Sequence, residues 1–148
     1  MKSSFPFTFF TVVFASVLSF GCGGSDIGGG GGDPIANRAD VIGSWTGSLV
    51  YGADYAGNSD TVAIAVSSTG VITGSSTGSF GGEGAAISGT VDPDGTFFAT
   101  YIYPTKVFSI SGQFRKPDNS HLNGTHTWQQ TGSGSVIVGP ATFGLTRI

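Results

Sequence analysis

A three-residue motif recurs along the chain: an aliphatic residue, a small polar residue and a glycine, each time within a stretch that alternates apolar and polar residues. Alternation with a period of two is typical of a β-strand that buries one face. The aliphatic residue and the glycine fall on that same face, where glycine lets a strand bend sharply inward, as a closed barrel requires. The motif therefore predicts strongly curved β-structure. It occurs at Ile72-Thr73-Gly74, Ile87-Ser88-Gly89, Ile110-Ser111-Gly112 and Leu122-Asn123-Gly124.

Three candidate hairpin turns predict how neighbouring strands pair. Asp92-Pro93-Asp94-Gly95 fits a type I turn followed by a glycine in the left-handed region. We treat Ser68-Thr69-Gly70 and Pro117-Asp118-Asn119 in the same way. All three registers place one apolar face opposite another, which a slip of one residue would invert. The expected pairs are Val91 with Phe97, Gly89 with Ala99, Ile87 with Tyr101, Val66 with Ile72, Ile64 with Gly74, Phe114 with Leu122, Gly112 with Gly124, Ile110 with His126 and Phe108 with Trp128.

Strands joined by sequential hairpins predict an all-β domain, an eight-stranded antiparallel up-and-down barrel, with a β-sandwich as the alternative. Only 10% of the residues are charged and 26 are glycine, a composition that disfavours helices. In the last strand, Gly139-Pro140 predicts a bulge or an edge kink. The expected strands are 43–51, 60–67, 71–76, 85–91, 96–103, 107–115, 120–128 and 136–147.

The N-terminus has the pattern of a secretory signal. Lys2 precedes an apolar run from Phe5 to Phe20, which is shorter than the roughly 20 residues that a membrane-spanning helix needs. Gly21-Cys22 follows, and the segment resembles a bacterial lipoprotein signal, with Ser19 at a position where such signals usually have leucine. The resemblance implies that Cys22 becomes the lipid-modified first residue of a protein of the bacterial cell envelope, anchored on its periplasmic or outer-membrane face.

These features divide the chain into three parts. Residues 1–21 form the expected signal peptide, 22–40 the lipidated cysteine and a Gly-rich tether, and 41–148 the barrel domain. Cys22 is the only cysteine, so no intrachain disulfide can form.

The links between strands predict one closed end and one open end. The links 67–71, 92–96 and 116–120 are short and fall at one end, whereas 52–59, 77–84 and 129–135 are longer and fall at the other. Inward positions near the longer links are rich in aromatic residues with polar tips, which is typical of a pocket for a small, partly apolar ligand. The alternative is that these side chains fill the barrel, since eight strands enclose little free space. The residues are Tyr51, Tyr101, Tyr103, Phe108, His126 and Trp128.

At the closed end, a closed barrel makes the first and last strands antiparallel neighbours, so that Arg147 meets Trp45 and covers its indole. Gly43-x-Trp45 together with an arginine in the last strand resembles the lipocalin (calycin) superfamily, and the Gly-x-Trp opening is also similar to avidins. The resemblance implies that Trp45 and Arg147 are a structural lock of the barrel, and that the protein carries or sequesters small hydrophobic ligands. Lipocalins usually have a helix beside the barrel, and this sequence predicts none.

Several chemistries find no support in the sequence. The net charge of −3 and the lack of a basic stripe argue against nucleic-acid binding. His121 and His126 differ in parity and point to opposite faces, so we expect no metal site, and Asp92-x-Asp94-Gly95 is interpreted as a turn rather than a calcium loop. No acid–base pair or nucleophile set is evident, so we expect neither an enzyme nor a cofactor.

We therefore expect a lipid-anchored envelope protein that binds a small hydrophobic or aromatic molecule in the open end of the barrel. The alternative is a structural or protein-interaction lipoprotein with a filled barrel. Phe98 and Ile102 are apolar exceptions on an outer face otherwise rich in serine and threonine, and they mark a candidate patch for weak self-association.

Overall fold

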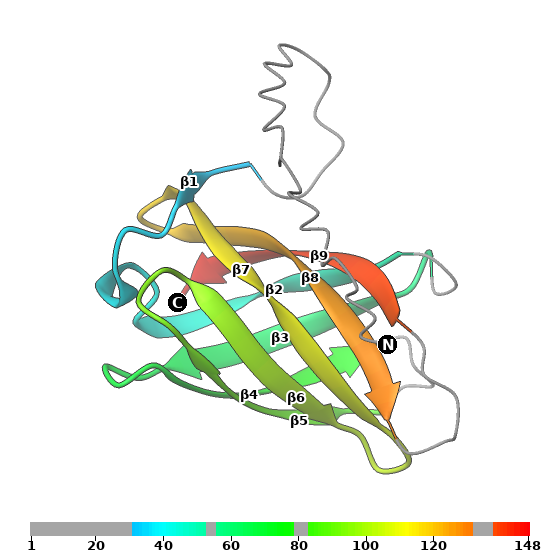
Figure 1. The fold of residues 1–148 in the computed structure, drawn as a ribbon. Helices are drawn as coiled ribbons and strands as arrows, with labels where there is room; N and C mark the ends of the chain where they lie inside the picture. The colour runs from blue at the N-terminus through cyan, green and yellow to red at the C-terminus, as the bar shows by residue number, and fades with distance from the viewer. Residues whose placement is uncertain (1–30, 53–55, 79–82, 132–137) are drawn as a thin grey trace, which may run out of the picture.

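The computed structural model describes residues 31–52, 56–78, 83–131 and 138–148 (Figure 1). Eight strands form a closed antiparallel barrel in which each strand pairs with the next and the last returns to the first, and one short extra strand is added. The expected barrel is confirmed, and the sandwich alternative is wrong. The barrel strands are β2 (Gly43–Tyr51), β3 (Ser59–Val66), β4 (Val71–Gly78), β5 (Ala85–Val91), β6 (Thr96–Ile102), β7 (Val107–Asp118), β8 (His121–Thr131) and β9 (Val138–Arg147).

The expected registers of two hairpins are confirmed. Val66 lies opposite Ile72 between β3 and β4, and Val91 lies opposite Phe97 between β5 and β6. In both hairpins the glycine of the turn has a positive φ, 85° at Gly70 and at Gly95, as the left-handed position requires. The turn chemistry alone was therefore enough to set these two registers.

The expected register of β7 with β8 is wrong by two residues. Phe114 lies opposite Gly124 instead of Leu122, because the turn is centred further along, between Asp118 and His121. A β-bulge, in which Lys116 and the residue after it oppose a single residue of β8, absorbs part of the difference. Because the shift is even, both strands keep their expected inward faces.

Ordered structure begins before Val41, where the sequence suggested that the folded part would start. The extra strand β1 (Asp33–Pro34) pairs with β7 at its bulge, beyond Gln113, which pairs with the first residue of β6. A 3-10 helix, η1 (Arg38–Asp40), follows, and Ile35 and Val41 are buried in the core. Together these residues cover the end of the barrel that holds the short hairpins and the C-terminus, seen at the left of Figure 1.

The glycines of the recurring motif lie on inward faces, where two strands approach closely. A Cβ atom added to Gly74 would overlap the carbonyl oxygen of Ala63, and one added to Gly89 would overlap that of Phe98. Only glycine fits such positions, so the motif marks the points at which the sheet curls on itself.

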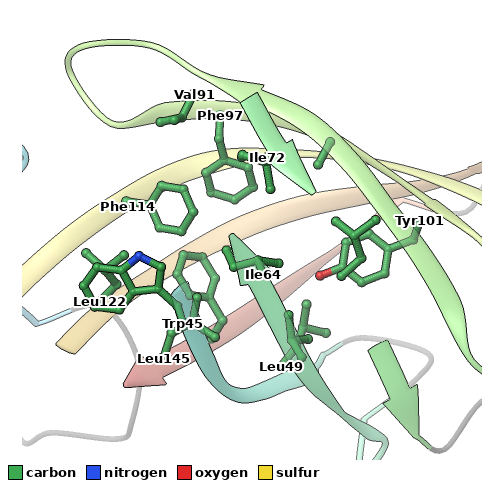
Figure 2. Packing of buried hydrophobic residues seen from close by; sticks show 14 of the residues in the cluster. Trp45, Leu49, Ile64, Ile72, Val91, Phe97, Tyr101, Phe114, Leu122 and Leu145 are labelled. Carbon is green, nitrogen blue, oxygen red and sulfur yellow. The ribbon is translucent and has the colours of Figure 1, made fainter. Parts of the chain in front are cut away.

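The core fills most of the barrel interior (Figure 2). Near the closed end, Phe97, Phe114 and Phe143 form an aromatic cluster with ring centroids 4.6–5.8 Å apart. No helix within the described part of the chain is both long and apolar enough to cross a membrane.

Candidate functional site

All six side chains expected at an open mouth are buried. Four of them, Tyr51, Tyr103, Phe108 and Trp128, pack edge to face and are called the aromatic plug below. The Trp128 ring lies 5.8 Å from that of Tyr51 and 5.4 Å from that of Phe108, and the rings of Tyr103 and Phe108 are 5.7 Å apart. These side chains therefore close the expected mouth by packing against one another.

Gly139 provides the space for the indole of the plug. A Cβ atom at Gly139 would lie 2.9 Å from Cζ2 of Trp128, which is directly opposite on β8. The register of β8 with β9 continues through Gly139 and Pro140 without a shift, so the bulge expected there as one of two alternatives is wrong. Pro140 is exposed to solvent, and Gly139 makes room for the indole ring.

A buried carboxylate, which the sequence analysis missed, ties the plug together. Asp60 is 2% exposed, and one of its oxygens, Oδ2, accepts hydrogen bonds from the hydroxyls of Tyr51 (3.0 Å) and Tyr103 (2.7 Å). The sequence contained one indication of this burial. Asp60 is two residues before Val62 and four before Ile64, so in a strand it lies on the same inward face of β3. A polar residue at such a position needs partners, and tyrosine hydroxyls were expected nearby.

Burial keeps both tyrosines of this cluster protonated. Desolvation, followed by the neighbouring hydroxyl of Tyr103 and the charge of Asp60, raises the pKa of Tyr51 far above its usual value. Desolvation and the hydrogen bond to Asp60 raise the pKa of Tyr103 to about 12. Both hydroxyls therefore stay hydrogen-bond donors throughout the physiological pH range.

His126 lies deeper in the barrel than the plug. Its position on β8 is opposite Gly112 on β7 and Ala141 on β9, and its ring packs against Phe97 (6.3 Å) and Phe143 (5.9 Å). The residue is 4% exposed, and within the described residues neither ring nitrogen has a hydrogen-bond partner. Leaving a buried polar group unsatisfied costs about 1–3 kcal/mol.

The surroundings of His126 keep its imidazole neutral. Burial lowers its pKa from 6.5 to about 4, because the apolar interior disfavours the imidazolium. A neutral imidazole has one nitrogen that accepts a hydrogen bond and one that donates. His126 therefore offers both functions to anything that reaches it.

A cavity of about 30 Å³ lies in the barrel interior beside His126. This volume suits roughly two water molecules, at about 10–15 Å³ each, and is well below the ~150 Å³ of a cavity that holds benzene. Of the six expected ligand-binding residues, Tyr101 and His126 line it, and Figure 2 shows the hydroxyl oxygen of Tyr101 directed into the interior. The other lining residues are Leu49, Val62, Ile64, Ile72, Ile87, Phe97, Ala99, Ile110, Phe114, Phe143 and Leu145.

At the closed end, Arg147 lies opposite Trp45 in the ladder between β2 and β9, with its guanidinium carbon 4.4 Å from the ring centroid. The indole Nε1 donates a hydrogen bond to the carbonyl oxygen of Val41 (2.9 Å). Gly43 has a φ of 131°, and a Cβ atom there would lie 3.3 Å from Nη1 of Arg147. The Gly-x-Trp motif thus leaves room for the arginine that covers the tryptophan.

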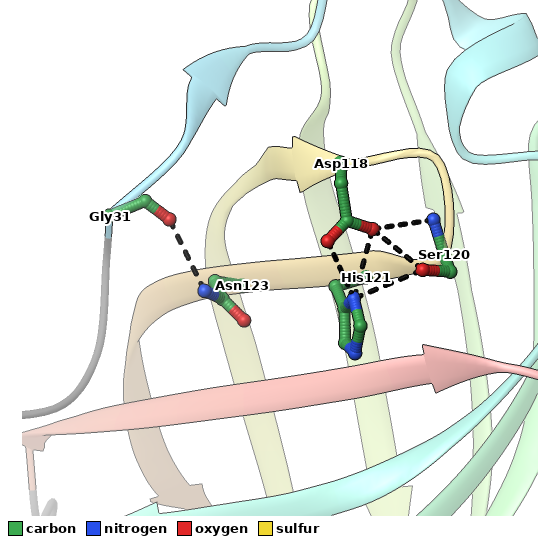
Figure 3. A network of polar contacts seen from close by, with 5 residues as sticks. All are labelled: Gly31, Asp118, Ser120, His121 and Asn123. Carbon is green, nitrogen blue, oxygen red and sulfur yellow. Dashed lines mark hydrogen bonds and ion pairs between the residues drawn. The ribbon is translucent and has the colours of Figure 1, made fainter.

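A serine, a histidine and an aspartate also meet at the β7–β8 hairpin tip (Figure 3). Ser120 Oγ donates to Asp118 Oδ1 (2.7 Å), and His121 Nδ1 lies 2.8 Å from Asp118 Oδ2 and 3.1 Å from Ser120 Oγ. In a catalytic triad the carboxylate and the serine bind different ring nitrogens, whereas here both lie at Nδ1. The cluster therefore stabilises the turn, and its hydrogen bonds, chiefly from Ser120, lower the pKa of Asp118.

The described residues contain no group of three or more histidine, cysteine, aspartate or glutamate side chains placed to hold a metal ion. Cys22, the expected signal peptide and the tether up to residue 30 lie outside the described residues, as do 53–55, 79–82 and 132–137 of the longer links.

The outer face of β6 is exposed at two apolar side chains, Phe98 (59%) and Ile102 (50%). A depression of about 250 Å³ lies beside Phe98. Small polar side chains of β7 and β8, including Ser111 and Thr127, border it. Both apolar side chains that the sequence placed on the outer face are therefore on the surface.

No protein-family model and no curated protein matches the chain. Among solved structures, EF1p2_mFAP2b bound to DFHBI is similar, with a TM-score of 0.60 and 17% sequence identity over 77% of this chain and 99% of that one. At this level of identity the similarity establishes the fold alone, an eight-stranded antiparallel barrel.

Proposed function

We propose that the barrel binds a small, uncharged, largely apolar or aromatic molecule in its interior, between the closed end and the aromatic plug. The observation that carries this proposal is the internal cavity, whose lining is apolar except for His126 and Tyr101. An apolar cavity with few convergent polar groups is typical of small-molecule sites. The similar barrel EF1p2_mFAP2b was solved bound to DFHBI, which supports the binding of a small molecule by a barrel of this architecture.

Ligand entry requires the plug to move, because the cavity of about 30 Å³ is too small for an aromatic molecule. The plug end is the favoured route, since its strands are joined by the longer links. The opposite end is sealed by Ile35, Val41 and the covered Trp45, all buried. Displaced aromatic side chains would then line the enlarged pocket, in keeping with the ligand-binding role expected for Tyr51, Phe108 and Trp128.

The proposed attachment to the cell envelope rests on the sequence. Lipid at Cys22 would hold the protein to the periplasmic or outer-membrane face, and the described chain enters the barrel at the closed end, where β1 lies (Figure 1). The plug end would then face away from the membrane. Replacing Cys22 by serine should move the protein from the membrane fraction to the soluble fraction; unchanged fractionation would contradict the anchor.

Native mass spectrometry of the full chain, extracted in detergent from envelopes of an expressing bacterium, tests the ligand. We expect a small-molecule adduct with the wild type that is lost in Ala99→Leu, because Ala99 lines the cavity and leucine would fill it. Ala86→Leu, on the outer face of the adjacent strand, is the matched control and should keep the adduct. Loss of the adduct in both variants, or in neither, would contradict an interior site.

A second candidate function is a structural or interaction role with a filled barrel. The small volume of the cavity and the exposure of Phe98 and Ile102 favour it. The same experiment separates the two, since a filled barrel predicts a mass without adduct that a panel of hydrophobic probes does not change.

A further inference from the structure

We infer that the molecule bound in the barrel carries a hydroxyl group, phenolic in an aromatic ligand, and that this group hydrogen-bonds to His126. The inference rests on the proposed function and names the chemistry of its ligand. It starts from an imidazole that is 4% exposed, borders the cavity and has no hydrogen-bond partner within the described residues.

The surroundings of His126 show why the ring is a recognition group rather than a packing element. Its ring neighbours are Phe97 and Phe143, which offer neither donor nor acceptor. A leucine or phenylalanine would fill this position without burying unsatisfied polar atoms. In the ligand-free protein, the cavity of about 30 Å³ admits one or two waters, which can satisfy the ring until a ligand displaces them.

The charge of the interior excludes ionic partners. The cavity lining contains no lysine or arginine, so a carboxylate or phosphate on the ligand would be buried without a counter-ion. A cation would have to be desolvated beside a neutral imidazole. The one buried carboxylate among the described residues, Asp60, does not line the cavity and is already bound by two tyrosine hydroxyls. The polar group of the ligand is therefore uncharged.

Among uncharged groups, a hydroxyl fits His126 best. A neutral imidazole presents an acceptor nitrogen on one side and a donor N–H on the other, and which is which depends on the tautomer. A hydroxyl can donate to the first or accept from the second, whereas a ketone or ether can only accept. The hydroxyl of Tyr101, directed into the same interior (Figure 2), is a second polar group in the lining of the cavity that a bound molecule can use.

The test compares two probes of nearly equal shape, p-cresol and p-xylene, which differ by a hydroxyl in place of a methyl group. Their affinities are measured by calorimetry for the full chain in detergent, for His126→Leu and for His126→Gln. We expect the wild type to bind p-cresol at least about tenfold more tightly than p-xylene, the equivalent of about 1.4 kcal/mol. His126→Leu should remove this preference, and His126→Gln, which keeps a donor and an acceptor, should restore part of it.

A second readout reports on the ring itself. The chain has two histidines, so the ring nitrogens of His126 can be followed by 15N NMR with the exposed His121 as an internal reference. We expect p-cresol, but not p-xylene, to shift the His126 ring nitrogens. This signal distinguishes hydrogen bonding to His126 from a general effect of the substitution on packing.

The outcomes separate the inference from the proposed function. Equal affinity for the two probes, or a preference for p-cresol that survives in His126→Leu, would overturn the hydroxyl partner while leaving an interior apolar site. Failure of the wild type to bind either probe or any dye of a hydrophobic panel would overturn both proposals.

Discussion

Gly139 and Trp128 face each other across the β8–β9 ladder, and the missing side chain of the first makes the space that the indole of the second occupies. A Cβ atom on Gly139 would lie 2.9 Å from Cζ2 and 3.0 Å from Nε1 of Trp128. Contacts this short force the ring or the strand to move. The packing of the aromatic plug therefore depends on a residue that contributes no side chain to it.

We predict that Gly139→Ala destabilises the protein by about 1–3 kcal/mol, since overpacking a filled interior has costs of this size. Gly144→Ala, on the same strand, is the control, because its Cβ atom would meet nothing closer than the Asn123 Oδ1 atom at 3.5 Å. Urea unfolding followed by tryptophan fluorescence measures both. Equal stability of the two variants would show that the plug adapts freely.

The Asp60 cluster gives a second prediction. Tyr103→Phe removes the 2.7 Å hydrogen bond to the carboxylate, and Tyr51→Phe removes the 3.0 Å one. Each should lower the free energy of unfolding by about 1.5–3 kcal/mol, the range for hydrogen bonds to charged groups. Both hydrogen bonds end on Asp60 Oδ2, so the effects of the two substitutions should not be additive: the loss of unfolding free energy in the double variant should differ from the sum of the two single losses.

Tyr101→Phe is the matched control for this cluster, since no hydrogen bond to Asp60 holds its hydroxyl among the described contacts and its ring faces the cavity. A loss as large in Tyr101→Phe as in Tyr103→Phe would show that the carboxylate contributes nothing specific. Thermal or urea unfolding of the four variants provides the comparison.

The faces of the strands were predictable because parity and turn chemistry are local properties. Ile72 and Gly74 lie on the inward face that the period-two alternation assigns, and the Gly70 and Gly95 turns set their own registers. The meeting of Arg147 with Trp45 followed from closure alone, since the first and last strands of a closed barrel must pair.

Three other features of the structure could not be predicted from local sequence patterns. The bulge at Lys116 depends on where the chain turns back and on the extra strand that pairs there, neither of which has a periodic signal. Whether Tyr51 and Trp128 line an open mouth or pack into a plug depends on side-chain volumes contributed by several strands at once. Asp60 escaped notice because an acidic residue beside a loop is ordinarily exposed.

The contact between Arg147 and Trp45 at the closed end gives a third prediction. Arg147→Met keeps the length of the side chain but removes the cation 4.4 Å from the Trp45 ring, and should lower the free energy of unfolding by about 1 kcal/mol. Arg147→Lys should lose less, because it retains a cation. Urea unfolding of both checks this, and an unchanged midpoint for Arg147→Met would mean that Arg147 acts only as cover for the indole.

The exposed patch on β6 gives a fourth prediction. If Phe98 and Ile102 mediate weak self-association, Phe98→Thr should reduce the concentration-dependent sedimentation of the protein while changing its stability by less than about 0.5 kcal/mol. Val50→Thr removes a comparably exposed apolar side chain (46%) from β2 and is the control. A wild type that stays monomeric at every concentration would contradict self-association through this face.

His126 makes the stability of the barrel depend on pH in a defined window. In the unfolded chain the imidazole takes up a proton as the pH falls through about 6.5, whereas in the folded protein burial holds its pKa at about 4. Between these values the unfolded state binds more protons, so stability falls as the pH is lowered, by up to about 3 kcal/mol, and is constant above this window. Asp40 and Asp94, whose folded pKa values are lowered from 3.8, add their own losses only at lower pH. Unfolding measured between pH 7 and 4 should show the drop in the wild type and in His121→Gln but not in His126→Leu; a drop that persists in His126→Leu would show that another group titrates in this window.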